Sequence, residues 1–257
     1  MSKTILPSSA DRQRAQYTPP PLGSVGANGE RLRRPWIDFG PPVAEYPYAD
    51  ARRRVLLRKV RFAPPGGNPP KAFRMYARRR ESNSTWLKPR DLKRKYPYAA
   101  EYFDGLLYRL PELLVALRSP DNGPIWWCAG EKDTDAVAKL GVVAVTHWQG
   151  EAVGASELQA EHFRGWRGGI YLIADRDTTG AFDVVRRFDL LRAVGTPARH
   201  LRIVVGAVEG KGADAFDHIQ AGGGLDDFIV VPVDRAREIA ARSTAQRRSR
   251  DGYGGAR

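Results

Sequence analysis

Residues 169–180 constrain the possible folds of this chain more than any other stretch. They read GIYLIADRDTTG, in which an apolar run ends at Asp175 and Asp177 and Gly180 opens a segment with helical spacing. This order predicts a buried strand that delivers two carboxylates to its carboxyl end. In open parallel sheets ligands bind outside that end of the strands, where two carboxylates and water can reach a hard cation. Alternatively, Asp175 starts a turn and Asp177 caps the next helix.

From residue 125 onward, apolar strands alternate with helical segments. Each predicted strand is followed by a loop and a helix, and the strands fall at 125–128, 142–146, 170–174 and 201–205. Such alternation indicates an α/β fold, with an open parallel four-stranded sheet and helices on both faces. The last helix of the series begins near Asp214, and Asp217 falls on the same side of it.

The net charge of the chain lies entirely in the part that precedes this alternation. The whole chain carries +13, residues 1–124 account for all of it, and residues 125–257 are balanced. Within the first part, residues 51–100 hold 16 Lys and Arg side chains against Glu81 and Asp91. So much positive charge, interleaved with aromatic residues, is typical of a region that contacts a polyanion such as nucleic acid. A solvated basic surface is the alternative.

Two segments of this basic region, 54–62 and 72–78, alternate apolar and basic residues around a turn rich in Pro and Gly. They predict an antiparallel hairpin with arginines on one face. That face could bind phosphates by charge and bases by stacking, or its arginines could merely block edge pairing. The candidate nucleic-acid-binding residues are Arg58, Arg61, Arg74, Tyr76, Arg78 and Arg79, with Lys93 and Arg94 from a second basic cluster and Lys211 from the later loop.

The expected domain plan has four parts. A flexible arm occupies 1–43, a basic β-rich (α+β) region 44–122, the α/β domain 123–233, and a basic flexible tail 234–257. We expect no transmembrane helix, because no apolar run is long enough, and no membrane partner. The single cysteine, Cys128, excludes an internal disulfide and fits a cytoplasmic location.

Three motifs together resemble a known family. Residues 130–137 (GEKDTDAV), 173–180 (IADRDTTG) and 210–218 (GKGADAFDH) are similar to the motifs of Toprim domains, and are closest to primase-like Toprim proteins of phages, plasmids and integrated elements. The resemblance covers residues 125 to about 232. It implies a metal site for Mg²⁺ or Mn²⁺ on Asp175 and Asp177.

The resemblance breaks at one position. The family glutamate at the end of the first strand corresponds to Ala129, which can act neither as an acid nor as a ligand. Glu131, two residues on, is the candidate catalytic substitute, or else it stabilises the first turn of its helix. Asp214 and Asp217 match the family's third acidic motif and could complete the metal shell through water, while Lys211 could contact phosphate.

Three functions follow from these features. The first is primase-like metal-dependent nucleotidyl transfer in the replication of a phage, plasmid or mobile element, with single-stranded DNA and nucleotides as partners. The second is a catalytically impaired Toprim module that binds nucleic acid within a replication assembly. The third is a metal-dependent nuclease of the OLD type. A helicase or other replication protein is a further expected partner, because the chain has no GxxxxGK[ST] motif.

Overall fold

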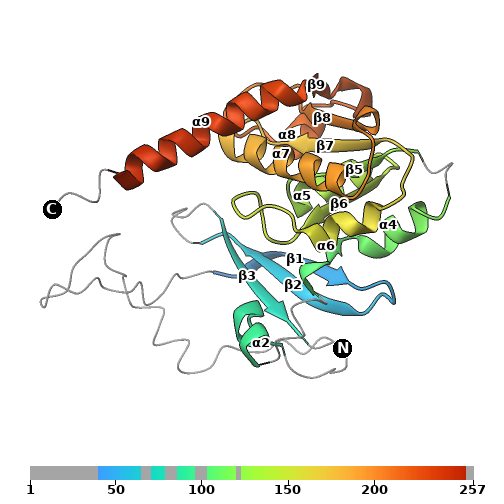
Figure 1. Cartoon of the computed structure of the whole chain (residues 1–257). Helices are drawn as coiled ribbons and strands as arrows, with labels where there is room; N and C mark the ends of the chain where they lie inside the picture. Colours follow the sequence, from blue (N-terminus) through green and yellow to red (C-terminus); the bar gives the residue numbers. More distant parts are fainter. Residues whose placement is uncertain (1–39, 65–70, 79–85, 96–102, 120–122, 253–257) are drawn as a thin grey trace, which may run out of the picture. The chain divides into compact units, whose positions relative to one another are not determined.

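The computed structural model describes residues 40–64, 71–78, 86–95, 103–119 and 123–252 (Figure 1). The chain divides into two compact units, one formed by residues 1–45 with 60–74 and the other by residues 46–59 with 75–257. Among the described residues, no helix is long and apolar enough to cross a membrane.

The basic region forms a three-stranded sheet in the order β1-β2-β3. Its strands are β1 (Pro42–Ala49), β2 (Val55–Phe62) and β3 (Ala72–Ala77). The last two match the predicted hairpin, whereas β1 was not predicted. Asp50 closes the β1–β2 turn, because its Oδ1 accepts hydrogen bonds from the backbone N–H groups of Arg52 and Arg54 at 2.9 and 3.0 Å.

The larger sheet has six strands in the order β4-β6-β5-β7-β8-β9. The four central strands are parallel, as predicted, and the two edge strands are antiparallel. In chain order the strands are β4 (Leu107–Tyr108), β5 (Ile125–Trp127), β6 (Val143–His147), β7 (Ile170–Ala174), β8 (Leu201–Val205) and β9 (Ile229–Val231). The carboxyl ends of the four parallel strands therefore share one edge of the sheet.

Helices cover both faces of this sheet (Figure 1). Trp126 and Trp127 illustrate the two faces, because neighbouring strand residues point in opposite directions. Trp126 stacks on Tyr171 with ring centroids 4.3 Å apart, and Trp127 stacks on Phe163 at 5.1 Å. The α-helices are α2 (Pro89–Lys95), α4 (Leu110–Ala116), α5 (Glu131–Ala138), α6 (Glu157–Ala160), α7 (Thr178–Ala193), α8 (Ala215–Gln220) and α9 (Val233–Gly252).

The described end of the chain differs from expectation. Residues 233–252 form α9, where a flexible tail was expected from 234. Ala236 and Ala240 are buried, and Arg237 pairs with Asp189 of α7 at 2.7 Å. Two buried alanines four positions apart and one ion pair therefore accompany the packing of this helix on α7. The other predicted domain boundaries stay predictions.

Candidate functional site

Asp175 and Asp177 lie where β7 ends and α7 begins. Asp177 is the N-cap of α7, and its Oδ1 accepts hydrogen bonds from the backbone N–H groups of Thr179 and Gly180, both at 2.8 Å. The helix approaches the strand so closely that a Cβ on Gly180 would lie 2.5 Å from the carbonyl oxygen of Asp175. The cap interpretation of Asp177 is confirmed, and the same geometry keeps both aspartates at the carboxyl edge of the sheet.

The third acidic motif, residues 210–218, is hydrogen-bonded to Arg176, which lies between the two aspartates. The backbone N–H of Arg176 donates to the carbonyl of Ala213 at 3.0 Å, and the N–H of Gly212 donates back to the carbonyl of Arg176 at 3.2 Å. Asp214 then caps α8, in a reciprocal capping box in which it accepts from the N–H of Asp217 at 2.8 Å. Asp217 is exposed, and its carboxylate accepts from the N–H of Asp214, so it stabilises the start of α8. Its part in a metal shell stays a prediction.

The start of α5 joins the same edge. Asp133 is buried, and its Oδ1 accepts a hydrogen bond from the N–H of Phe216 at 3.1 Å. Lys132 places its Nζ 3.7 Å from Asp214 Oδ2 and 3.5 Å from the centroid of the Phe216 ring. The structure therefore brings the first and third acidic motifs together, as their positions after parallel strands predict.

Mutual repulsion between carboxylates is strong at this edge. The pKa of Asp175 is raised to about 9, first by burial and then by the charges of Glu151, Asp133, Asp214 and Asp177, in that order. Asp175 Oδ1 is buried without a hydrogen-bond partner within the described parts of the chain. A cation bound beside such a carboxyl group would stabilise its ionised form.

Glu151 is the site residue that sequence reasoning missed. It lies in the loop after β6, and its Oε1 is buried with no hydrogen-bond partner among the described residues. Its pKa is raised to about 7, chiefly by burial and then by the charge of Asp183, while the charge of Arg187 opposes the shift. The only signal in the sequence is an acidic residue in a βα loop at the correct edge of a parallel sheet.

Glu131, the predicted catalytic residue, is the first residue of α5 and is only 4% exposed. Its carboxylate accepts a hydrogen bond from the hydroxyl of Tyr48 and forms an ion pair with Lys59, whose Nζ lies 2.8 Å from Oε1 and 3.1 Å from Oε2. Glu131 therefore links α5 to strands β1 and β2, and a catalytic role for it stays a prediction.

The carboxylates at this edge fit a hard divalent cation. Mg²⁺ is commonly held by one or two carboxylates, by substrate phosphates and by water. The unpartnered oxygens of Asp175 and Glu151 suit that mode. Within the described residues there is no group of three or more His, Cys, Asp or Glu side chains that could by itself hold a metal ion. A cation here would therefore take its remaining ligands from water and phosphate.

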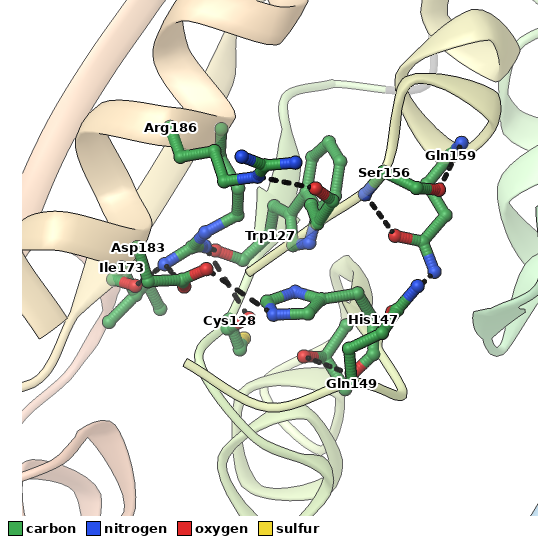
Figure 2. Close-up of polar contacts among 12 residues, drawn as sticks. Trp127, Cys128, His147, Gln149, Ser156, Gln159, Ile173, Asp183 and Arg186 are labelled. Carbon is green, nitrogen blue, oxygen red and sulfur yellow. Dashed lines mark hydrogen bonds and ion pairs between the residues drawn. The ribbon is translucent and has the colours of Figure 1, made fainter. Parts of the chain in front are cut away.

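A buried charge network joins α7 to the neighbouring strands of the sheet (Figure 2). Arg187 and Asp183 of α7 are fully buried and form an ion pair of 2.9 Å, and Asp183 Oδ1 lies 3.3 Å from Nε2 of His147. Arg187 also donates to the carbonyl oxygens of Trp127 at 2.5 Å and Ile173 at 2.8 Å. One arginine thus ties α7 to the carboxyl ends of β5 and β7. His147 is the last residue of β6.

The predicted nucleic-acid-binding residues fall into separate groups. Arg58 and Arg78 both lie over the ring of Trp86, at 4.9 and 5.0 Å from its centroid, and Arg78 donates to the carbonyl of Val55 at 2.7 Å. In the other compact unit, Arg74 lies 6.0 Å from the ring of Phe62. Arg94 and Lys211 are exposed, Arg61 and Tyr76 are half-buried, and Arg79 and the side chain of Lys93 lie outside the described residues.

A pocket of about 390 Å³ opens beside Asp175 and Asp177. Its walls are mostly apolar and come from β7, β8, β9, α7 and the start of α9. Arg176 and Arg235 are the basic side chains in its lining. The volume is within the range of small-molecule sites.

Comparison of the fold with solved structures gives matches to bacterial primases. The catalytic core of DnaG primase superposes with a TM-score of 0.50 at 15% identity, covering 75% of this chain and 54% of that one. The fold is primase-like.

Two further matches have lower TM-scores. The E. coli primase catalytic core has a TM-score of 0.48 at 17% identity, covering 71% of this chain and 49% of that one. A DnaG primase catalytic domain bound to single-stranded DNA has a TM-score of 0.49 at 14% identity, covering 75% and 54%. The chain thus spans about half the length of the primase cores that it matches. The sequence matches no protein-family model, and comparison with curated protein sequences gives no match.

Proposed function

We propose that this chain carries a primase-like, metal-dependent nucleotidyl-transfer site at the carboxyl edge of its parallel sheet. The observation that carries the proposal is Asp175, a buried carboxyl group with an unpartnered oxygen and with other carboxylates gathered around it. The likeness of the fold to a primase catalytic core supports the choice of reaction class.

The residues at this edge have distinct tasks in the proposed reaction. Asp175 and Asp177 would hold a Mg²⁺ or Mn²⁺ ion, and Asp214, whose charge contributes to the raised pKa of Asp175, would bind its water ligands. When bound, the ion supplies positive charge that neutralises phosphate oxygens and orients them for in-line attack. The pocket beside the aspartates offers apolar walls for a nucleoside, and Arg176 and Arg235 line it. Exposed Lys211 is available to incoming phosphate.

The template would be single-stranded nucleic acid, held by the basic region. Arg58, Arg78 and Trp86 form a compact cluster of charge and aromatic surface, and both features favour phosphates and stacked bases. The resemblance to primase-like Toprim proteins makes the replication of a phage, plasmid or mobile element the proposed setting, with a helicase as a candidate partner.

Synthesis of oligonucleotides on a defined template tests this function. The full chain is incubated with single-stranded DNA, labelled ribo- or deoxynucleotides, and Mg²⁺ or Mn²⁺. We expect template-dependent products that disappear in Asp175→Asn and persist in Asp189→Asn, a surface position on α7. Absence of products under all four combinations of nucleotide and metal would contradict the proposal.

Ala129 supports a second candidate, a binding module without turnover. The residue is buried and carries no ionisable group at the end of the first parallel strand. In that case the chain retains single-stranded DNA or a metal-bound nucleotide but makes no product, and Ala129→Glu generates synthesis. Cleavage of plasmid or single-stranded DNA without nucleotides would instead identify the nuclease.

A further inference from the structure

The order of the strands puts the loop after β6 next to the position of Ala129. In the sheet β5 lies between β6 and β7, and all three strands are parallel. Ala129 follows the end of β5, Glu151 lies in the loop after β6, and Asp175 directly follows β7. The position at which the chain has only a methyl group is therefore flanked by Asp175 on one side and by the loop of Glu151 on the other.

This loop is held in place from both of its ends. The N–H of Gly154 donates to the carbonyl of Gly150 at 2.9 Å, which closes a tight turn around Glu151. Gly154 has a φ of 77°, and a Cβ there would lie 2.6 Å from Cδ of Arg186, so the turn packs directly on α7. Arg186 Nε then donates to the carbonyl of Ala155 at 2.7 Å.

Side-chain amides fasten the remainder of the loop (Figure 2). Gln159 Nε2 donates to Gln149 Oε1 at 3.0 Å and to the carbonyl of Leu106 at 2.8 Å, and Ser156 caps α6 in a capping box with Gln159. The loop is thus a built element fixed against α6 and α7. A glutamate placed there has a defined position relative to the start of α7, where Asp177 lies.

The charges around Glu151 also associate this residue with Asp175 and Asp177. Among neighbouring charges, Glu151 has the largest effect on the pKa of Asp175, after burial itself. Asp177 and Asp133 in turn raise the pKa of Glu151, after burial and Asp183. Its buried Oε1 has no hydrogen-bond partner among the described residues, whereas Glu131 is held by Tyr48 and Lys59. Burial of a carboxylate oxygen without a partner is costly unless a ligand compensates.

We propose that Glu151 provides the carboxylate that Ala129 cannot, by binding a water ligand of the divalent cation held by Asp175 and Asp177. The reaction assigned to the site rests on the function proposed above, but the contribution of Glu151 to cation binding does not depend on turnover. The site is then complete with a glutamate that comes from β6 rather than from β5. Ala129 is tolerated because the carboxylate arrives from the adjacent loop.

Binding of Mn²⁺ to the full chain, followed by the electron paramagnetic resonance signal of free Mn²⁺, tests this inference without any need for activity. We expect Glu151→Gln and Glu151→Ala each to weaken Mn²⁺ binding about tenfold or more, which is the scale seen when support of a metal site is removed. Glu157→Gln is the matched control, since Glu157 is exposed and lies six positions on in the first turn of α6. We expect it to bind Mn²⁺ as the unaltered chain does.

A rescue variant distinguishes a carboxylate that acts on the cation from a merely structural residue. Ala129→Glu combined with Glu151→Gln restores Mn²⁺ affinity if the two positions serve the same ion. Melting temperatures in EDTA show that each variant is folded, and we expect Glu151→Gln to melt no lower than the unaltered chain because it removes a buried like charge.

The outcomes distinguish this inference from the proposed function. Loss of Mn²⁺ affinity in Glu151→Gln without any oligonucleotide synthesis by the unaltered chain supports the inference and contradicts the function. Synthesis by the unaltered chain with unchanged Mn²⁺ affinity in both Glu151 variants contradicts the inference and leaves the function standing. Absence of Mn²⁺ binding by the unaltered chain contradicts both.

Discussion

At the residue scale, the strongest constraint on the site is the buried contact between Asp183 and Arg187. Burial alone would raise the pKa of Asp183, but the charges of Arg187 and His147 hold it below its ordinary value. Arg187 in turn donates to the carbonyl oxygens at the ends of β5 and β7. The ionised pair therefore sets the spacing of the strand ends from which the site is built.

Replacement of Asp183 by Asn should strongly lower the free energy of unfolding. It leaves the Arg187 guanidinium buried without its counter-charge, and the loss of one partner of a buried pair typically lowers the free energy of unfolding by about 3–5 kcal/mol. Asp189→Asn on the same helix breaks only the exposed pair with Arg237, so we expect a loss below about 1 kcal/mol. Urea unfolding of the two variants measures the difference. Equal losses of stability would show that the buried pair contributes no more than the exposed pair.

The pH dependence of stability reports directly on the acidic cluster. In the metal-free protein Asp175 has a pKa of about 9 and Glu151 one of about 7, against ordinary values of 3.8 and 4.5. Between about pH 4 and 9 the folded chain thus binds more protons than the unfolded chain. Stability should fall as the pH rises through this window and level off above it.

The loss of stability with rising pH arises from Asp175 if the Asp175→Asn variant shows a smaller loss. Urea unfolding in EDTA at pH 6 and pH 8.5 measures the effect, which is at most about 1.4 kcal/mol per pH unit for one group. We expect a smaller loss of stability between these pH values in the variant than in the unaltered chain. Identical pH dependence in the two proteins would place the carboxyl group of Asp175 in a more solvated environment than the structure gives it.

At the element scale, α7 combines the roles of scaffold and site. Its N-cap is Asp177, so the same side chain stabilises the helix and belongs to the acidic edge. Asp177→Ala should lower the free energy of unfolding by about 1 kcal/mol, whereas Asp177→Asn keeps the cap and should change it by less than about 0.5 kcal/mol. Both should abolish nucleotidyl transfer, because both remove the charge. Oligonucleotide synthesis and urea unfolding are measured for both variants. Retention of synthesis in Asp177→Asn would show that Asp177 acts only as a helix cap.

The sequence predicted the elements whose patterns are long enough to be distinctive. The four parallel strands and the strand-end position of Asp175 and Asp177 follow from apolar runs that end in acidic residues. Strands β4 and β9 have two and three residues, too few to show a period, and they exist because the sheet edges offer backbone partners.

Tertiary contacts account for the other differences. α9 looks flexible by composition, yet Ala236 and Ala240 dock on α7. Glu151 has no motif around it, and only the turn on Gly154 and the packing on Arg186 bring it to the site. The pairing of Glu131 with Tyr48 and Lys59 joins residues 83 and 72 positions apart in the chain, which no local pattern indicates.

At the scale of the whole molecule, charge and chemistry are carried by different parts of the sequence. The +13 net charge belongs to residues 1–124, while the carboxylates of the site belong to the parallel sheet. This division suits a protein that holds a polyanion with one region and binds cations with another, since a uniformly basic surface would weaken cation binding.

Binding of single-stranded DNA should accordingly depend on salt and on the basic region. We expect log K to fall linearly with log salt concentration, with a slope that becomes shallower by about 0.7 for each phosphate that the protein no longer neutralises. Arg58→Gln should reduce this slope, whereas Arg199→Gln, an exposed arginine near the amino end of β8, should not. Fluorescence anisotropy over a range of salt concentrations measures both, and equal slopes would remove Arg58 from the interface.

In our proposal the carboxyl edge of the parallel sheet is a divalent cation site. Anomalous scattering from crystals of the full chain grown with Mn²⁺ tests it most directly. We expect a peak within ligand distance of Asp175 and Asp177, with the carboxylate of Glu151 turned toward it and Glu131 still bound to Tyr48 and Lys59. A fully occupied peak elsewhere on the chain, or an edge without any peak at saturating Mn²⁺, would contradict it.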